Sequence, residues 1–407
     1  MVNSSFDEHP EPDPRTRTGC RVLRAYSGPA MVYHLRGYSL VQEKDPLRKE
    51  EKTVISLRFY RIYDIGREID LDWLEKALAQ NYFTARTSFV RVKQKSIMIE
   101  EPPLMIQMHP IRIEREGKPF EFSVVARVYD IGVISFCFIF EDPLAHYSTL
   151  EEIAFLFSGQ EGLSEFYVQY LKTLGEIVRP HIRNFAIDPD FFEDYTVYVT
   201  DHRDDTLDHI PLLLGEKATF SPQIREDILK NALSFTTNDL ALLSWDSALL
   251  CNPESPTDII DLIEFANVQV LELRYYDREL TREMEKMYDD IEHADRLSQF
   301  RRSRQYHAIM AKQMENSAEI SEVIEKVNNL IKVTEDVYYA RVYAIALKVL
   351  RSGLWSESVS RKIDIIRENY SMLSDEVRIQ HSNRLEWVVI ILIALELVLA
   401  IWQSIGA

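Results

Sequence analysis

The sequence predicts an α+β protein in three consecutive parts: an N-terminal mixed α/β domain, long coiled-coil-like helices and one C-terminal transmembrane helix. All 16 prolines lie at or before Pro256, and the residues after it include only two glycines, Gly353 and Gly406. Because proline and glycine disrupt helices, this predicts an almost wholly helical C-terminal part. Runs rich in β-branched and aromatic residues lie before Pro256, and the chain closes on the apolar run WVVIILIALELVLAIW.

These signals give the expected boundaries. Residues 1–20 form a disordered acidic tail, residues 21–256 the α+β domain, residues 257–384 a helical bundle or coiled-coil region, and residues 385–405 the transmembrane helix. The domain over 21–256 is either one unit or two subdomains with a break near residues 100–120, and both readings stay open. The stretch SPTD, starting at Ser255, is a typical helix start.

The N-terminal domain is predicted from short strand-like runs such as TVISLRFYRIYDIG, FSVVARVYDIGVISFCFIF and DLALLSWDSALLC. Helical patterns interrupt them, for example IDLDWLEKALAQN, in which Asp70 is a candidate N-cap. The hexapeptide RIYDIG at 61–66 recurs as RVYDIG at 127–132. A duplicated strand-turn unit and shared turn chemistry both explain this echo, since Asp followed by Gly is a turn signal.

A long helix is expected to start near Ile259, and its apolar residues recur at alternating steps of four and three. The predicted seam consists of Ile263, Val270, Leu273, Leu280, Met284, Met287 and Ile291. The one polar residue at a seam position is Asp277. This heptad spacing indicates a coiled-coil-like contact, and packing inside a helical bundle fits the pattern as well as a dimer seam.

The apolar run near the C-terminus predicts a membrane anchor. Its eleven Val, Ile and Leu residues contribute about −3 to −7 kcal/mol to insertion, which outweighs about 2.5–3.5 kcal/mol for the central acid Glu396. Trp387 and Trp402 bracket the run, Glu386 stands at its start, and Arg384 precedes it. The positive-inside rule then places the bulk of the chain on the cytoplasmic side of a single-pass membrane protein. A buried core helix is the alternative.

Composition narrows the function classes. A net charge of −18 and a pI near 5.1 argue against a general nucleic-acid-binding surface, and a local basic patch stays open. No direct sequence-specific binding of nucleic acid is expected. Three widely spaced cysteines without a C-x-x-C pair indicate a reducing compartment and no zinc knuckle. The sequence contains no P-loop, no G-x-G-x-x-G and no H-E-x-x-H motif. We therefore expect neither catalytic residues nor a cofactor.

The densest polar cluster is TDHRDDTLDH, at residues 200–209. His202, Asp205 and His209 are its candidate metal ligands, because imidazole and carboxylate groups bind divalent metals. The spacing matches no established metal-site pattern, and such runs are usually solvated loops. A metal site and a solvated loop are therefore the two readings of this segment.

The C-terminal part resembles a known family. The residues that carry the resemblance are EDVYYARVYAIALKVLRSGLWSESVSRKIDIIRENYSMLSDEV at 335–377, RLEWVVIILIALEL at 384–397, NVQVLELRYYD at 267–277 and SWDSALL at 244–250. They resemble the family of the "required for meiotic nuclear division" proteins. The resemblance implies an α+β domain followed by helices and one membrane span, oligomers, and a role in supporting translation at a membrane. It supplies no catalytic residues, and it fits a prokaryotic member best.

Together these observations predict a tail-anchored, self-associating scaffold or tether with no catalytic site. Its expected partners are the membrane, further copies of the chain, and an unidentified protein or ribosomal client. The alternative is a subunit of an oligomeric ion channel or transporter, which also combines an α/β head, long helices and a membrane segment.

Overall fold

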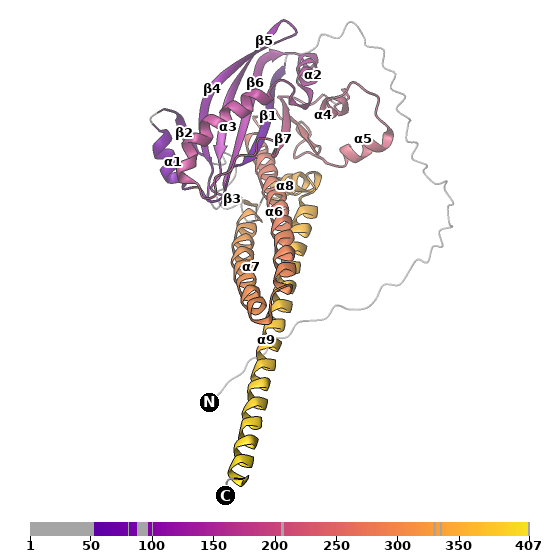
Figure 1. Cartoon of the computed structure of the whole chain (residues 1–407). Helices are drawn as coiled ribbons and strands as arrows, with labels where there is room; N and C mark the ends of the chain where they lie inside the picture. The colour runs from indigo at the N-terminus through magenta and orange to yellow at the C-terminus, as the bar shows by residue number, and fades with distance from the viewer. Residues whose placement is uncertain are drawn as a thin grey trace, which may run out of the picture. The chain divides into compact units, whose positions relative to one another are not determined.

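The structure is a computed structural model, and it describes residues 53–79, 81–87, 97–99, 101–204, 207–328, 331–333 and 336–405. The expected acidic tail over residues 1–20 lies outside the described residues. The described chain is a mixed α/β domain with a large sheet, followed by helices (Figure 1).

The large sheet has nine strands in the order β2-β4-β5-β6-β1-β7-β10-β9-β8. The strands are β1 Thr53–Asp64, β2 Phe83–Arg86, β4 Leu104–Arg115, β5 Lys118–Val128, β6 Val133–Ala145, β7 Phe192–Thr200, β8 Ala232–Leu233, β9 Leu240–Leu243 and β10 Ser247–Cys251. Neighbouring strands are antiparallel except for β7 and β10, which run parallel. A separate pair joins β3 Ile97–Ile99 to β11 Ile331–Val333.

Strand β1 lies at the centre of the sheet and is buried on both faces. Its sequence TVISLRFYRIYD is almost continuously buried and lacks the alternation of a half-exposed strand. On one face pack α1 Leu71–Leu78, α2 Tyr147–Leu156 and α3 Ser164–Val178, and on the other α6 Thr257–Asp295 and α8 Val337–Val349. Two-sided burial explains why the strand is rich in large residues throughout.

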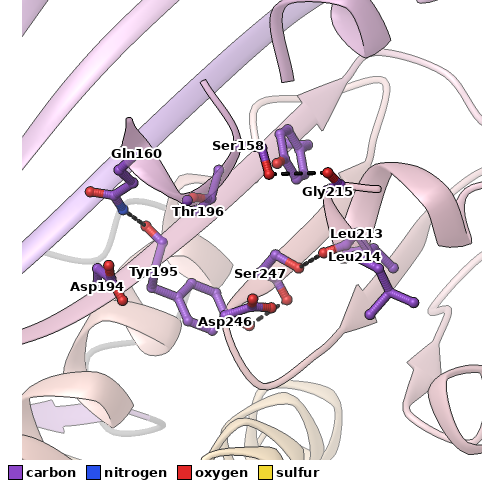
Figure 2. Close-up of a pocket in the computed structure, with 12 residues that line it drawn as sticks. Ser158, Gln160, Asp194, Tyr195, Thr196, Leu213, Leu214, Gly215, Asp246 and Ser247 are labelled. Carbon is purple, nitrogen blue, oxygen red and sulfur yellow. Dashed lines mark hydrogen bonds between the residues drawn. The ribbon is translucent and has the colours of Figure 1, made fainter. Parts of the chain in front are cut away.

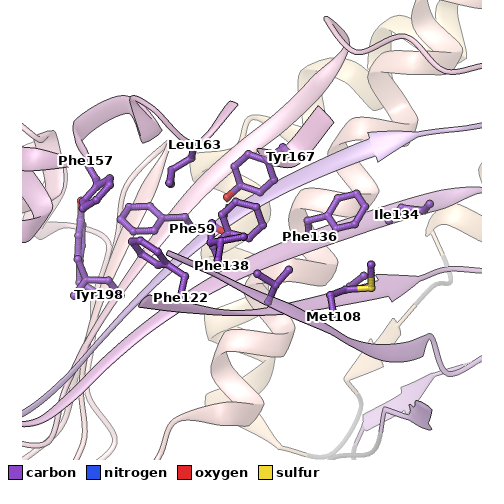
Figure 3. Close-up of a cluster of buried hydrophobic side chains, with 14 of the residues drawn as sticks. Phe59, Met108, Phe122, Ile134, Phe136, Phe138, Phe157, Leu163, Tyr167 and Tyr198 are labelled. Carbon is purple, nitrogen blue, oxygen red and sulfur yellow. The ribbon is translucent and has the colours of Figure 1, made fainter. Parts of the chain in front are cut away.

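Aromatic side chains fill the core under α3 (Figure 3). The rings of Phe138 and Tyr167 stack with centroids 4.0 Å apart, and the Tyr167 hydroxyl donates a hydrogen bond of 2.8 Å to the Phe59 carbonyl. Phe59 meets Phe122 edge-on at 6.1 Å. Stacking and a buried hydrogen bond therefore fix α3 on β1 and β6 together.

Local signals explain where several helices begin and end. The Asp70 side chain accepts a hydrogen bond from the Trp73 amide at the start of α1, and Ser221 caps α5 Pro222–Leu229 in the same way. Helix α6 begins at Thr257, directly after Pro256, and the Ser255 hydroxyl bonds to that of Thr257 instead of capping the helix. Smaller helices are α4 Ile210–Leu214 and the 3-10 turns η1 Ser158–Gln160 and η2 Arg179–His181.

The C-terminal helices form a bundle. Helices α6, α7 Gln299–Asn328 and α9 Ser352–Ile405 pack on one another, and α8 lies against α6 (Figure 1). Between α8 and α9 the chain turns at Arg351, which has a left-handed φ of 58°. The first half of α6 packs on the sheet and its second half on α7 and α9, so α6 belongs to both parts.

A buried ionic contact joins α6 to the sheet. The Arg127 guanidinium lies 2.7 Å from Asp261 and also pairs with Glu264, while the Tyr129 hydroxyl donates a 3.3 Å hydrogen bond to Glu264. Burial alone would lower the pKa of Arg127, but the two carboxylates raise it well above its usual value. Burial also raises the pKa of Glu264, and Arg127 counteracts this.

The predicted transmembrane helix is wrong. Across the described residues, no helix combines the length and the apolar character that crossing a bilayer requires. The apolar run belongs to α9, and its described side chains extend from Leu385 to Val398 and include Glu386 and Glu396. The tail anchor and the single-pass localisation, which depended on this helix, are corrected with it.

The Arg127 contact yields a first prediction. Arg127→Met leaves two buried carboxylates without their cation, so the free energy of unfolding should fall by about 3–5 kcal/mol in urea titrations followed by circular dichroism. Arg112→Met is the matched control, because Arg112 pairs with Glu121 across exposed strands and its loss should cost less than about 1 kcal/mol. Equal losses in both variants would contradict a special role for the Arg127 contact.

Candidate functional site

The two described candidate metal ligands, His202 and His209, have separate hydrogen-bond partners. His202 Nδ1 lies 2.9 Å from the Asp201 carboxylate, and His209 Nδ1 lies 2.7 Å from the Tyr147 hydroxyl on α2. Asp205 lies outside the described residues. Within the described ranges, no group of three or more histidine, cysteine, aspartate or glutamate side chains could hold a metal ion. The two histidines lie in the loop between β7 and α4, and each binds a different neighbour.

The predicted seam packs inside one chain, and its residues are buried except for Met284 and Ile291, which are partly buried. Ile263 packs with the sheet and α8, and Leu273 packs with the ends of β1 and β6. Further along α6, the seam residues that contact α7 and α9 are Leu280, Met284, Met287 and Ile291. Val270 is also buried. The heptad rhythm therefore serves two successive intrachain contacts, first with the sheet and then with the bundle.

The polar seam residue Asp277 is explained by α9. Lys362 Nζ lies 2.6 Å from the Asp277 carboxylate and 2.9 Å from its backbone carbonyl, and the Ser358 hydroxyl donates to the same carboxylate at 2.6 Å. Both charged side chains are about four-fifths buried, at 17% and 21% exposure. A single polar contact in an apolar seam fixes the register of two helices, here α6 and α9.

The far end of α9 is an exposed apolar surface. Glu386 and Glu396 are exposed, and each of the eleven large apolar side chains from Leu385 to Val398 is 48–65% exposed. The side chains of Arg384 and Trp402 are outside the described part of the chain. Contiguous apolar exposure of this kind marks an interaction surface. We call Leu385–Val398 the apolar end of α9.

A small polar pocket lies at the junction of η1, β7, α4 and the turn before β10 (Figure 2). Tyr195 builds its floor by donating from its hydroxyl to the carbonyls of Ser244 and Ser247, at 3.0 and 2.7 Å. The Ser247 hydroxyl in turn donates to the Leu213 carbonyl at 2.6 Å. These bonds hold the turn against α4, so the pocket is part of the folded core.

Carboxyl and amide groups line this pocket. Gln160, in a left-handed backbone conformation, donates from Nε2 to the Tyr60 and Tyr195 carbonyls, while its buried Oε1 has no hydrogen-bond partner among the described residues. Burial raises the pKa of Asp194 and of Asp246, and Arg61, 3.8 Å from Asp194, counteracts this at Asp194. The free volume is about 70 Å³. That space suits a few waters or a small cation, since pockets for larger ligands have about 300 Å³ or more.

Sequence reasoning missed this pocket because its residues come from four distant segments. The one local signal is SGQEG at residues 158–162, in which two glycines flank the strained Gln160. Gly159 and Gly162 both have positive φ. A tight turn could therefore have been predicted there, but the two acids opposite it could not.

The repeated hexapeptides lie on strands β1 and β5, which flank β6. Ile62 and Arg127 both pair with Ser135, so the copies are offset by one residue. A shift of one residue moves each side chain to the opposite face. Arg61 therefore points to α3, where it donates to Ser164 at 3.0 Å, whereas Arg127 points to α6.

The Asp-Ile-Gly ends of the two copies meet as adjacent turns, which we call the twin turns, residues 64–66 and 130–132. The Ile65 amide donates to the Gly132 carbonyl at 2.9 Å. Gly132 has a φ of +98°, and a Cβ there would lie 2.2 Å from the Gly66 carbonyl oxygen. Only glycine fits this contact. The echo therefore produces a packed pair of turns and no repeated binding site.

A known protein family matches the part of the chain that forms the sheet. Residues 54–257, half of the chain, match the family described as "Uncharacterized protein MJ0711, N-terminal domain". The chain belongs to this family. It is 24% identical over 220 residues to "Uncharacterized protein MJ0711" of Methanocaldococcus jannaschii, a match that covers 52% of this chain and 66%, just under two thirds, of that relative. No solved structure matches.

The MJ0711 family match contains nearly all of the nine-stranded sheet, the twin turns and the polar pocket. It ends at the first residue of α6, so α6 to α9 and the apolar end lie beyond it. The family match thus covers the sheet, and the helical half of the chain lies outside it.

The α6–α9 register contact gives a second prediction. Lys362→Met leaves the mostly buried Asp277 carboxylate without its cation, which should lower the free energy of unfolding by about 1–3 kcal/mol in urea titrations. The neighbouring Arg361→Met is the control, because Arg361 pairs with Glu357 on the exposed face of α9 and its loss should be nearly neutral. A Lys362→Met loss no larger than the control's would remove this contact as the register device.

Proposed function

We propose that the chain is a self-associating scaffold protein that works by assembly and not by catalysis, and that copies join through the apolar end of α9. The observation that carries this proposal is the exposure of eleven large apolar side chains on one helical segment. Such a segment gains about 1.5–3 kcal/mol for each side chain that passes from full exposure to full burial. At half of this gain per residue, the eleven side chains together contribute about 8–16 kcal/mol, which is of the same order as the roughly 4–15 kcal/mol that association costs.

The distribution of apolar residues argues for more than two copies. Val388 to Leu395 are eight consecutive apolar residues, so every face of the helix is apolar there. One partner helix covers a single stripe, as in a two-stranded coiled coil, and leaves the rest exposed. A bundle of several α9 helices covers more of each copy. Glu396 would then lie between helices, where a carboxyl group must be paired or neutral.

The first part of α9 gives this assembly a fixed base. Val359, Ile363 and Leu373 are buried against α6 and α7, and Lys362 sets the register with Asp277. The apolar end continues the same helix, so it is presented by a folded bundle. Self-association would thereby bring several sheet domains together.

The client of the scaffold is proposed from resemblance. The C-terminal residues resemble the "required for meiotic nuclear division" proteins, which implies a role in supporting translation. We propose the translation machinery as the client on this ground. Co-sedimentation of the purified full chain with ribosomes at low and high salt tests it, and a chain that stays in the supernatant at low salt contradicts it.

Self-association is the third prediction. The full chain, 47.6 kDa per copy, should elute as an oligomer larger than a dimer in size-exclusion chromatography with light scattering. Ile390→Glu with Ile393→Glu should shift it toward the monomer, because two buried carboxylates in the bundle cost several kcal/mol. Glu396→Gln should retain the oligomer, since a neutral amide can still hydrogen-bond.

The matched control is Phe235→Glu, which alters an apolar side chain that is 75% exposed in the loop between β8 and β9. It should leave the oligomer unchanged. A monomeric wild-type chain at every concentration would overturn the proposal, and so would equal dissociation of the control.

A further inference from the structure

Three buried carboxyl groups meet where the twin turns contact α6. Asp64 ends β1, Asp130 lies in the turn between β5 and β6, and Glu272 lies on α6. Their side chains belong to residues that are 6%, 5% and 1% exposed. The surrounding packing is apolar, since Ile62, Ile131 and Val133 contact Leu271 and Leu273 of α6, among others. Acidic side chains are rarely buried to this extent unless they are paired.

The turn geometry fixes two of the acids in place. The Gly66 amide donates to Asp64 Oδ1 at 3.0 Å, and the Ile69 amide donates to the Asp130 backbone carbonyl at 2.8 Å. Asp64 Oδ2 and both oxygens of Glu272 have no hydrogen-bond donor from the rest of the described chain. A proton carried by one of these two side chains can serve both, since a neutral carboxyl donates and a carboxylate accepts.

The charges around the cluster are mixed. Arg278 acts on Asp64 but also pairs with Asp188 at 3.1 Å and stacks on the Phe191 ring at 3.9 Å. Glu279 opposes it. Further polar groups near the cluster are Arg67 from the turn after β1 and Tyr275 and Tyr276 from α6.

Burial raises the pKa of Asp64 to about 7, although the Gly66 amide and Arg278 counteract it. Burial, followed by the nearby Asp64 carboxyl and by Asp130, raises the pKa of Glu272 well above its usual value. At neutral pH the pair therefore retains a proton.

We propose that Asp64, Asp130 and Glu272 form a proton-dependent latch between the twin turns and α6. Below neutral pH, the protonated carboxyl groups of Asp64 and Glu272 hold α6 on the turns. As the pH rises past neutral, Asp64 releases its proton to solvent first, and the negative charge left in the contact loosens α6. Because α6 continues into the bundle with α7 and α9, the latch sets how firmly the sheet holds the bundle. This inference is independent of the proposed self-association.

The direction of the pH effect follows from linkage. A carboxyl whose pKa is higher in the folded than in the unfolded chain stabilises the fold below the unfolded pKa, and this contribution is lost as pH rises through the folded value. For Asp64 the loss spans about pH 4 to pH 7 and continues higher for Glu272. Raising the pH from about 5.5 to about 8.5 should therefore lower the stability of the α6 contact.

The test compares Glu272→Gln with the wild type in thermal unfolding of the full chain across this pH range. Glutamine keeps the shape of a neutral carboxyl and cannot ionise. Between about pH 5.5 and 8.5, the fall in Tm should therefore be smaller in the variant by at least about 2 °C. Glu285→Gln is the matched control, because Glu285 is exposed on the same helix, and its pH dependence should follow the wild type.

Hydrogen exchange locates the effect. In the wild type, the exchange rates of the Ile65 and Ile69 amides and of the Glu264–Leu273 segment of α6 should rise at least about threefold between the lower and the higher pH, after correction for intrinsic exchange. The exchange rates of the core amides of β1 should rise less, and this difference locates the loosening. Glu272→Gln should remove this difference. Asp64→Asn should act in the same direction and serves if Glu272→Gln does not fold.

Identical pH profiles for the wild type and a folded Glu272→Gln or Asp64→Asn variant would overturn the latch. Uniform acceleration of exchange over the whole sheet would overturn it as well, because it would show global instead of local loosening.

Discussion

The pairing of Arg127 with Asp261 and Glu264 is the interaction on which the arrangement of the molecule depends. Among the described elements, α6 is shared by the sheet domain and the bundle, so its seat on the sheet positions α7, α8 and α9. The apolar contacts of α6 with the sheet are extensive but non-directional. A guanidinium held between two carboxylates adds direction, because it fixes which turn of α6 lies over β5.

The same helix carries a second group of buried acids, whose negative charge is compensated in a different way. Near its start, one cation pairs with both Asp261 and Glu264, whereas two to three turns later Glu272 faces Asp64 and Asp130, and a retained proton there adds to the effect of Arg278 on Asp64. An ion pair is strong over the whole neutral range, since arginine does not titrate there. A shared proton depends on pH. One contact can therefore stay fixed while the other responds.

Features that depend on adjacent residues can be predicted from the sequence, whereas contacts between distant segments cannot. The cap at Asp70, the Ser-Pro start at Ser221 and the onset of helix after Pro256 depend on a few adjacent residues, and the structure has a helix at each place. The seam residues were predicted as a coiled-coil-like contact, either in a dimer seam or inside a helical bundle. Their burial is divided between the sheet and the bundle, because heptad spacing reports an apolar face and not what covers it.

The wrong transmembrane prediction and the two missed sites both arise because each sequence argument considered one segment at a time. The transmembrane prediction summed the apolar residues of one segment, yet the described helices include none that could cross a bilayer. The polar pocket and the carboxyl cluster each combine residues separated by dozens of positions, so no window of sequence contains them. The twin turns illustrate this best: RIYDIG and RVYDIG are nearly identical, but a register offset of one residue sends their arginines to opposite faces. Arg61 then contacts α3 and Arg127 contacts α6, so nearly the same local sequence binds the helices on both faces of the sheet.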